Sequence, residues 1–229
     1  MNRCIITIDG PAGVGKSTAA RMLAGRLNAV FLDTGATYRA VTLAAMQAGA
    51  DLTDAKAVAG VMEQTQFEFI HQGDVLKVFI NGRDCTQDIR LPEVTDKVHH
   101  IASQPQLRAR LVKLQQDFAS RFEAVVTEGR DQGTVVFPDA QHKFFLTADP
   151  YERTRRRYIE LQTAGTPVDF DALAQQILLR DASDEKRSVG PLAPASDAVV
   201  IDTTCLDAQA VVEKMLSVIQ KKSYGKDKR

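Results

Sequence analysis

The stretch Gly10-Pro11-Ala12-Gly13-Val14-Gly15-Lys16-Ser17 decides the fold of this chain, because it matches the phosphate-binding pattern G-x-x-x-x-G-K-[ST] at every fixed position. It follows the apolar, β-branched residues 4–8, which are typical of a buried parallel strand, and a helical pattern over residues 16–27 overlaps its end. A glycine-rich turn in this position points successive backbone N–H groups at one anion, and the helix presents its positive end to the same anion. The stretch therefore predicts a nucleoside triphosphate site.

Two side chains of this stretch have expected roles at the phosphates. Lys16 can reach the terminal phosphates, and the hydroxyl of Ser17 can be a ligand of Mg²⁺. The N-K-x-D and D-x-x-G patterns of GTPases do not occur in the sequence, and motor-type ATPases usually have longer chains. We therefore expect a small kinase, in which a second substrate binds beside the triphosphate.

The rest of the chain alternates strand patterns with helix patterns. Further strands are expected at residues 30–32, 124–127, 143–146 and 198–201, and further helices at 38–47, 105–121, 151–162, 170–180 and 207–220. This alternation predicts an α/β fold whose five parallel strands are covered by helices on both faces. Residues 66–89 break the alternation with a β-hairpin pattern and turn signals at Gly73-Asp74 and Asn81-Gly82, which suggests a small appended lobe.

The composition argues against several other classes of protein. The 229 residues contain 29 lysines and arginines and 29 aspartates and glutamates, so bulk attraction to nucleic acid is not expected. No apolar run approaches the ~18 residues of a membrane span, and the run before Asp9 is too short for a signal-peptide core. Cys4, Cys85 and Cys205 are far apart and form no C-x-x-C pattern. We expect a soluble, cytoplasmic protein without structural zinc or disulfides.

Polar residues follow the second and third predicted strands, at the edge where open parallel sheets bind ligands. The second strand runs into residues 33–39, where Thr34 has a helix N-cap as its alternative role and Arg39 an ordinary surface position. The third strand runs into residues 127–134, where two glycines bracket the pair Arg130-Asp131. This arrangement is typical of a site loop, and an ordinary β-turn with a surface ion pair is its alternative.

Arginines accumulate in the second half of the chain. Arg153, Arg156 and Arg157 have the i, i+3, i+4 spacing that puts them on one helix face, although such a run is often only a solvated face. Arg180 and Arg187 share a second helical stripe with Asp184. A neutral protein that concentrates arginines near its predicted sheet edge is expected to bind anions, and two phosphorylated substrates would supply them.

The strings ITIDGPAGVGKST, LDTGATYRA, TEGRDQGTVVFPDA, ERTRRR and RDASDEKRSVGPLAPA, which run from residue 6 to residue 195, resemble the bacterial cytidylate kinases. This family is a branch of the nucleoside monophosphate kinases. The resemblance implies a single domain over residues 1–229 with five parallel strands in the order 2-3-1-4-5. It further implies a core of residues 1–62, 92–150 and 195–222, a monophosphate-binding insert at about 63–91 and an arginine-rich lid at about 151–194.

The resemblance also implies a role for each matching residue. The ATP phosphates would be held by Gly10, Pro11, Ala12, Gly13, Val14, Gly15, Lys16, Ser17 and Thr18, and from the lid by Arg153, Arg156 and Arg157. The acceptor phosphate would be held by Thr34, Arg39, Arg130 and Arg187, and the ribose by Arg180 and Asp184. The cytosine would be read by Arg108 and Asp131, with His99 at the position of a base-contacting serine. Catalysis itself would fall to Lys16, Arg130, Arg156 and Arg187.

The implied reaction is ATP + CMP → ADP + CDP, with dCMP also accepted, Mg²⁺ bound with ATP, and a monomer that binds neither nucleic acid nor membrane. Two alternatives stay open at this point. One is a kinase for a sugar or a shikimate-like acceptor, which would need a carboxylate to deprotonate the acceptor hydroxyl rather than several arginines. The other is a nucleotide-sensing module without catalytic activity, whose phosphate-binding loop controls a partner.

Overall fold

The computed structural model of this chain describes residues 3–72, 75–163 and 165–226. The chain divides into two compact units. The first unit contains residues 30–125, and the second contains residues 4–29 together with the chain from Val126 onward.

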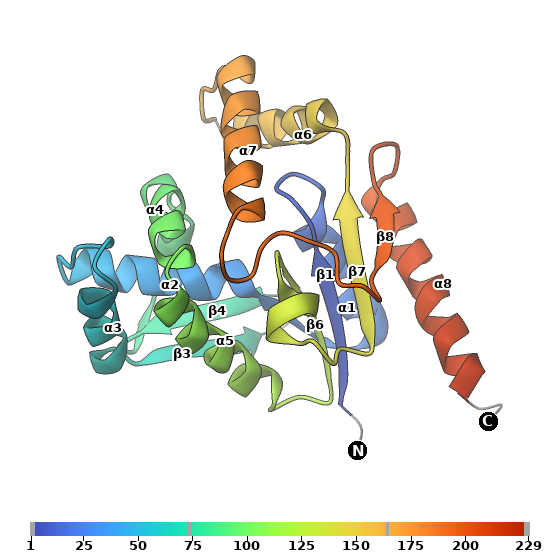
Figure 1. Cartoon of the computed structure of the whole chain (residues 1–229), viewed down its shortest axis with the longest axis horizontal. Coiled ribbons are helices and arrows are strands. Elements are labelled where there is room, and N and C mark those ends of the chain that lie inside the picture. The colour runs from blue at the N-terminus through green and yellow to red at the C-terminus, as the bar shows by residue number, and fades with distance from the viewer. Residues whose placement is uncertain (1–2, 73–74, 164, 227–229) are drawn as a thin grey trace. The chain divides into compact units, whose positions relative to one another are not determined.

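The central element of the fold is a five-stranded sheet in the order β2-β6-β1-β7-β8. Its strands are β1 (Cys4–Asp9), β2 (Val30–Asp33), β6 (Ala124–Gly129), β7 (His142–Thr147) and β8 (Val199–Asp202). Numbered along the chain, this is the expected order 2-3-1-4-5. The pairs β1–β7 and β7–β8 are parallel, and β1 and β7 run side by side in Figure 1. The predicted α/β fold with five parallel strands is therefore confirmed.

In the part of the second unit that the structure describes, four α-helices accompany the strands. They are α1 (Lys16–Leu27), α6 (Pro150–Thr163), α7 (Phe170–Glu185) and α8 (Ala208–Lys226). Helix α1 packs against α8, and α6 packs against α7. The neighbouring strands β1 and β7 are largely buried because most of their residues are apolar on both faces, as in Ile8 and Phe144, which are almost fully inaccessible.

The first unit combines helices with a small antiparallel sheet (Figure 1). Its further elements are α2 (Thr34–Gln47), α3 (Ala55–Gln64), β3 (Phe67–Gln72), β4 (Val75–Ile80), β5 (Arg83–Asp84), the 3₁₀-helix η1 (Asp88–Arg90), α4 (Pro92–Ala102) and α5 (Pro105–Ala119). Its core is built from the helices and contains Tyr38, Val41, Ala45, Val58, Ile101, Ala102, Leu107 and Leu111.

The predicted hairpin at residues 66–89 is confirmed, because β3 and β4 pair antiparallel with Phe67 opposite Ile80 and Gln72 opposite Val75. The Asn81-Gly82 turn is also confirmed, since both residues have left-handed backbone angles. The predicted turn at Gly73-Asp74 lies outside the described residues.

Several helices differ from the sequence-based expectation. Helix α2 begins at Thr34 rather than Tyr38, because the side chain of Asp33 accepts a hydrogen bond from the backbone N–H of Ala36 and caps the helix. The cap is thus Asp33, and the alternative that assigned this role to Thr34 is wrong. Helices α3 and α4 were not predicted, and α7 continues five residues beyond Arg180.

Gly10 lets the chain turn from β1 into the phosphate-binding stretch. Its φ is +145°, and a Cβ added there would lie 2.2 Å from the backbone oxygen of Leu146. We predict that Gly10→Ala lowers the free energy of unfolding by about 2 kcal/mol or more, because either the backbone angle or strand β7 must shift.

Gly25→Ala is the matched control in urea unfolding of both variants. Gly25 lies within α1 and no atom would contact an added Cβ, so that substitution should leave stability unchanged or raise it slightly. Equal stability of Gly10→Ala and the unsubstituted protein would contradict the close approach to Leu146.

Candidate functional site

The phosphate loop (residues 10–17) forms a tight turn between β1 and α1. Gly13 and Gly15 have left-handed backbone angles, and a Cβ on Gly13 would lie 2.9 Å from the backbone oxygen of Arg153. Lys16 folds back over the loop, where its Nζ donates a hydrogen bond of 2.6 Å to the carbonyl oxygen of Pro11. Only 6% of Lys16 is exposed. The loop therefore holds its lysine against its own backbone at the start of a 12-residue helix.

Lys16 is desolvated and lies among charged side chains of both signs. Burial lowers the pKa of Lys16 to about 7, and the positive charges of Arg130 and Arg180 add to this effect. The carboxylates of Glu128 and Asp9 oppose it without cancelling it. A multiply charged anion such as a triphosphate would favour the charged ammonium here, so the arrangement suits that class of ligand.

Ser17 and Glu128 provide oxygen donors beside the loop. The hydroxyl of Ser17 donates a hydrogen bond of 2.9 Å to Oε1 of Glu128. Hydroxyl and carboxylate oxygens are the hard ligands that Mg²⁺ prefers, and that ion usually binds one or two protein oxygens together with substrate phosphates. Within the described residues, no group of three or more histidine, cysteine, aspartate or glutamate side chains could hold a metal. These residues fit an ion that arrives with a nucleotide.

Asp9, at the end of β1, holds the loop that follows β6. Its two carboxylate oxygens accept hydrogen bonds of 2.8 Å from the backbone N–H groups of Gln132 and Gly133. Burial raises the pKa of Asp9 to about 6, although both hydrogen bonds favour the carboxylate. The segment Gln132–Val136 forms a π-helical turn, η2, rather than the ordinary β-turn of the sequence-based alternative. Asp131 lies at its start and is 4% exposed.

Asp184 binds two arginines in the second unit. Its Oδ2 accepts a hydrogen bond of 2.8 Å from Nε of Arg130, and its Oδ1 pairs with Nη2 of Arg187. The carboxylate is buried, whereas both arginine side chains keep part of their surface exposed. Desolvation and the nearby charge of Arg130 lower the pKa of Arg180. Four sequence-predicted site residues, from the loop after β6 and from α7 and its end, thus lie close together.

Arg153, on α6, is buried and contacts the phosphate loop. Its Nη1 donates a hydrogen bond of 3.2 Å to the carbonyl oxygen of Ala12, and the same group pairs with Asp181 of α7. The guanidinium therefore ties two helices of the predicted lid to the loop. Its expected contact with a triphosphate stays a prediction.

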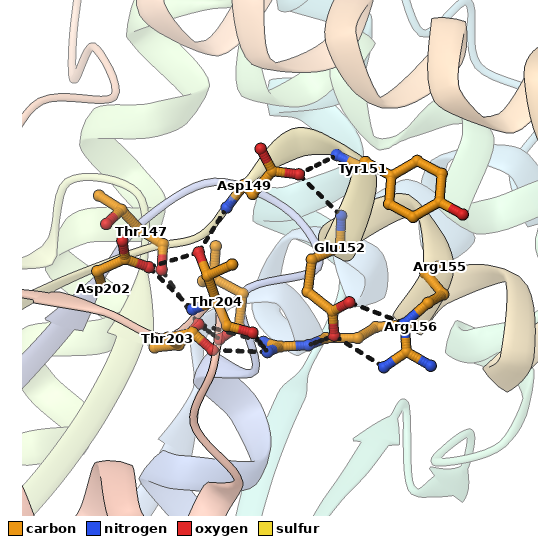
Figure 2. A network of polar contacts seen from close by, with 10 residues as sticks. Thr147, Asp149, Tyr151, Glu152, Arg155, Arg156, Asp202, Thr203 and Thr204 are labelled. Carbon is orange, nitrogen blue, oxygen red and sulfur yellow. Dashed lines mark hydrogen bonds and ion pairs between the residues drawn. The ribbon is translucent and has the colours of Figure 1, made fainter.

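Arg156 is anchored on the turn after β8 (Figure 2). Its Nη2 donates to the carbonyl oxygens of Thr203 and Thr204 at 2.6 and 3.2 Å, and its Nε donates to Glu152 at 2.9 Å. Thr203 in turn donates its hydroxyl to the carbonyl oxygen of Val14 in the phosphate loop. Hydrogen bonds from Arg155 and Arg156 lower the pKa of Glu152 to about 2. Arg157 pairs with Glu160 on the same helix, and the expected nucleotide contacts of both arginines stay predictions.

In the first unit, Asp33 also binds two arginines. Its Oδ2 accepts hydrogen bonds from Nη2 of Arg39 at 3.0 Å and from Nη2 of Arg90 at 3.2 Å. Gly35 makes room for this contact, because a Cβ there would lie 2.8 Å from Nη1 of Arg39. Thr34, the neighbouring predicted ligand, is 3% exposed.

The predicted base-reading residues of the first unit differ in burial. Arg108, on α5, is 2% exposed, donates to the carbonyl oxygen of Ala102 and lies 5.7 Å from the ring centre of Tyr38. His99 lies exposed on α4, where its Nδ1 is 2.7 Å from the carbonyl oxygen of Asp96. The structure thus places Arg108 beside the ring of Tyr38, whereas the hydrogen-bond partner of His99 belongs to the same helix as His99 itself.

Sequence reasoning did not single out Asp9, Asp33 or Arg90. A signal existed for the two aspartates, because each ends a parallel strand and directly precedes a glycine-bearing turn. No comparable signal marks Arg90, which follows the appended hairpin in an ordinary polar segment. Among the helices of the described residues, none is long and apolar enough to span a membrane.

Comparison with known proteins identifies close relatives. A family model described as cytidylate kinase matches residues 6–221 of this chain. The chain is similar to a cytidylate kinase of Syntrophotalea carbinolica, with 45% identity over 220 residues that cover 96% of this chain and 93% of that protein. It is also similar to a cytidylate kinase of Bacillus subtilis, with 43% identity over 218 residues, 95% of this chain and 97% of that protein.

Among solved structures, the chain is similar to an uncharacterized protein from Eubacterium ventriosum, with a TM-score of 0.50 and 13% sequence identity. The match covers 96% of this chain and 99% of that protein. At this level of identity the similarity concerns the fold alone.

The pKa of Lys16 leads to a prediction about proton linkage. Because this pKa is about 7, Lys16 is largely neutral at pH 8, and binding of a nucleoside triphosphate should favour its charged form. We expect proton uptake on ATP binding at pH 8, little uptake through this group at pH 6, and an affinity that falls as the pH rises above 7. Titration calorimetry at each pH in buffers of different ionisation enthalpy measures this uptake.

Lys16→Arg is the control, because a guanidinium stays charged throughout this pH range. That variant should take up no proton at pH 8. Equal proton uptake by the variant and the unsubstituted protein would show that another group is responsible.

Proposed function

This chain belongs to the cytidylate kinase family, and we propose that it transfers the γ-phosphoryl group of ATP to CMP and dCMP, which yields ADP and CDP or dCDP. The match over residues 6–221 carries this proposal, because it includes the phosphate loop, the loop after β6 and the arginines of α6 and α7. The alternative of a nucleotide-sensing module loses its support, since the relatives over nearly the whole chain are kinases.

The environment of the carboxylates also supports a phosphate acceptor. A kinase for a sugar hydroxyl would need an available carboxylate as general base. In the second unit, Asp9 accepts hydrogen bonds from two backbone N–H groups, and Glu128 accepts one from the Ser17 hydroxyl. Asp184 is paired with two arginines. In the first unit, Asp33 is likewise paired with two arginines. Aspartates that hold arginines favour an anionic acceptor over a neutral one.

The proposed chemistry needs no general base. An oxygen of the CMP phosphate is the nucleophile, and a phosphate monoester with a second pKa of ~6 is mostly deprotonated at neutral pH. The obstacle is repulsion between two anions, which the cationic side chains offset. Lys16 would neutralise the terminal phosphates of ATP, and the planar guanidinium groups of Arg130 and Arg187 would hold phosphate oxygens bidentately. Asp184 keeps both arginines oriented through its hydrogen bonds.

The proposed assignment of residues follows the family resemblance. ATP is assigned to the phosphate loop, Thr18, Arg153, Arg156 and Arg157. CMP is assigned to Thr34, Arg39, His99 and Arg108 in the first unit, and in the second unit to Arg130, Asp131, Arg180, Asp184 and Arg187. Arg156 is also assigned a catalytic role with Lys16, Arg130 and Arg187.

Ser17 is the proposed protein ligand of Mg²⁺. Its hydroxyl lies 2.9 Å from the Glu128 carboxylate, so the chain offers oxygen atoms of the kind this ion prefers. When bound with ATP, Mg²⁺ supplies further charge neutralisation at the phosphates. We also propose that residues 63–91 act as the monophosphate-binding insert and residues 151–194 as the lid of a single kinase domain, and that the protein is a cytoplasmic monomer.

The proposed activity is tested by a coupled assay for ADP release with ATP and each nucleoside monophosphate in turn. CMP and dCMP should support turnover, whereas gluconate and shikimate should not. Lys16→Ala should reduce turnover more than a hundredfold, because the loss of ~3–5 kcal/mol of transition-state stabilisation has that effect. Near-normal turnover by a folded Lys16→Ala protein would contradict the assignment of the phosphate loop.

Base selection yields a further prediction. The carboxylate of Asp131 would accept a hydrogen bond from the N4 amino group of cytosine, and Arg108 would donate a hydrogen bond to the acceptor edge of the base. Uracil has a carbonyl oxygen in place of the amino group and an N–H in place of the acceptor, so both contacts would be unfavourable. Each contact is worth ~1–3 kcal/mol, so kcat/KM should favour CMP over UMP by at least a hundredfold. Asp131→Ala should lower kcat/KM for CMP much more than for UMP.

Asp139→Ala is the matched control in these steady-state measurements. Asp139 follows the turn η2, at whose start Asp131 lies, but unlike Asp131 it is exposed. It should leave the ratio of CMP to UMP unchanged. If Asp131→Ala and Arg108→Ala also leave the ratio unchanged, the base is read by other residues.

A further inference from the structure

Asp33 holds together a pair of arginines that come from distant parts of the first unit. Arg39 lies on α2, and Arg90 is the last residue of η1, more than fifty positions along the chain. Both donate through Nη2 to the same oxygen, Oδ2 of Asp33, at 3.0 and 3.2 Å. The other oxygen, Oδ1, accepts the backbone N–H of Ala36. Both oxygens of the carboxylate therefore accept hydrogen bonds, and Oδ2 holds the two guanidinium groups next to each other.

The charges of this cluster do not balance. Two guanidinium groups share one carboxylate, and the first turn of α2 contains no acidic residue. The side chains of Asp33 and Arg39 are 7% and 18% exposed, whereas that of Arg90 is 41% exposed, so water screens the excess positive charge only from the side of Arg90. Like charges held this close together repel, and a divalent anion would relieve the repulsion.

The arginines retain hydrogen-bonding capacity for such an anion. Nε of Arg39 is buried and has no hydrogen-bond partner among the described residues. Arg90 reaches Asp33 with Nη2, while 41% of its side chain stays exposed. A guanidinium carries five N–H donors in a planar fork, which matches the oxygens of a phosphate group.

The backbone presents Arg90 from a well-defined turn. Its N–H donates to the carbonyl oxygen of Gln87 at 2.9 Å, and Pro92 begins α4 two residues later. In the same lobe, Arg83 pairs with Asp88 at 3.0 Å but does not contact Asp33, and its side chain is 70% exposed. The chain thus contains one arginine that joins the cluster and a neighbouring arginine that does not.

We propose that Arg90 is a further ligand of the acceptor phosphate, which it binds together with Arg39 while Asp33 keeps both guanidinium groups oriented. This inference rests on the proposed function, in which Arg39 contacts the phosphate of CMP. The ligand chemistry is that of a phosphate monoester dianion. The competing explanation is that Arg90 only braces η1 against the end of β2.

The test compares ligands that differ only in the phosphate. CMP and cytidine are titrated by NMR into the unsubstituted protein, Arg90→Gln, Arg90→Lys, Arg39→Gln and the matched control Arg83→Gln. Arg90→Gln should weaken CMP binding about 10- to 100-fold, since a charge-assisted hydrogen bond is lost, and should leave cytidine binding unchanged. Arg90→Lys keeps the charge but loses the planar fork, so its affinity for CMP should lie between that of Arg90→Gln and that of the unsubstituted protein. Arg83→Gln should behave as the unsubstituted protein.

The outcomes separate this inference from the proposed function. If Arg39→Gln weakens CMP selectively but Arg90→Gln and Arg90→Lys do not, the role of Arg90 is overturned and the proposed function stands. Equal weakening of CMP and cytidine in the Arg90 variants would identify a brace and would also overturn it. If the unsubstituted protein binds CMP no better than cytidine, the proposed function itself fails. If Arg90→Gln does not fold, the affinities of Arg90→Lys for CMP and cytidine are compared instead.

Discussion

Buried carboxylates that hold cationic side chains and backbone N–H groups are the interaction on which the rest of this structure depends. Asp9 and Asp33 each end a strand of the parallel sheet, and Asp184 lies near the end of α7. Asp9 orients a π-helical turn, whereas Asp33 and Asp184 each orient two arginines. An arginine that is held in place loses less conformational entropy when it binds a phosphate, so the acids prepare the cations for their ligands.

In each unit, one buried carboxylate is shared by two arginines. Around Lys16, burial and two arginines lower the lysine pKa despite two neighbouring carboxylates. Such a cluster is unfavourable by itself, and the favourable interactions with phosphate oxygens offset that cost in a complex. Arginines paired on each carboxylate favour a phosphorylated acceptor over a neutral hydroxyl, which would require a carboxylate that can take a proton.

The contacts of Arg153 and Arg156 show how one residue type serves different purposes. Arg153 and Arg156 are bound to carbonyl oxygens of the phosphate loop and of the turn after β8, as well as to acidic side chains. Because α6 carries both arginines, its position is coupled to the loop that is assigned to the triphosphate. The fold therefore connects the predicted nucleotide-binding elements of the second unit through backbone carbonyl groups.

The sequence by itself determined the α/β fold, the strand order through its family resemblance, the phosphate loop and the hairpin of residues 66–89. These features depend on local patterns: apolar runs of strand length, glycines that permit left-handed angles, and the fixed spacing of Lys16 and Ser17. Helices α3 and α4 were not predicted, although local signals mark both: the side chain of Asp54 caps α3, and Pro92 begins α4. Only the tertiary structure decided that Asp33 joins Arg39 to Arg90 and that Asp9 holds the loop after β6. Hydrogen bonds between residues far apart in sequence follow from the folded backbone, and they leave no local pattern in the sequence.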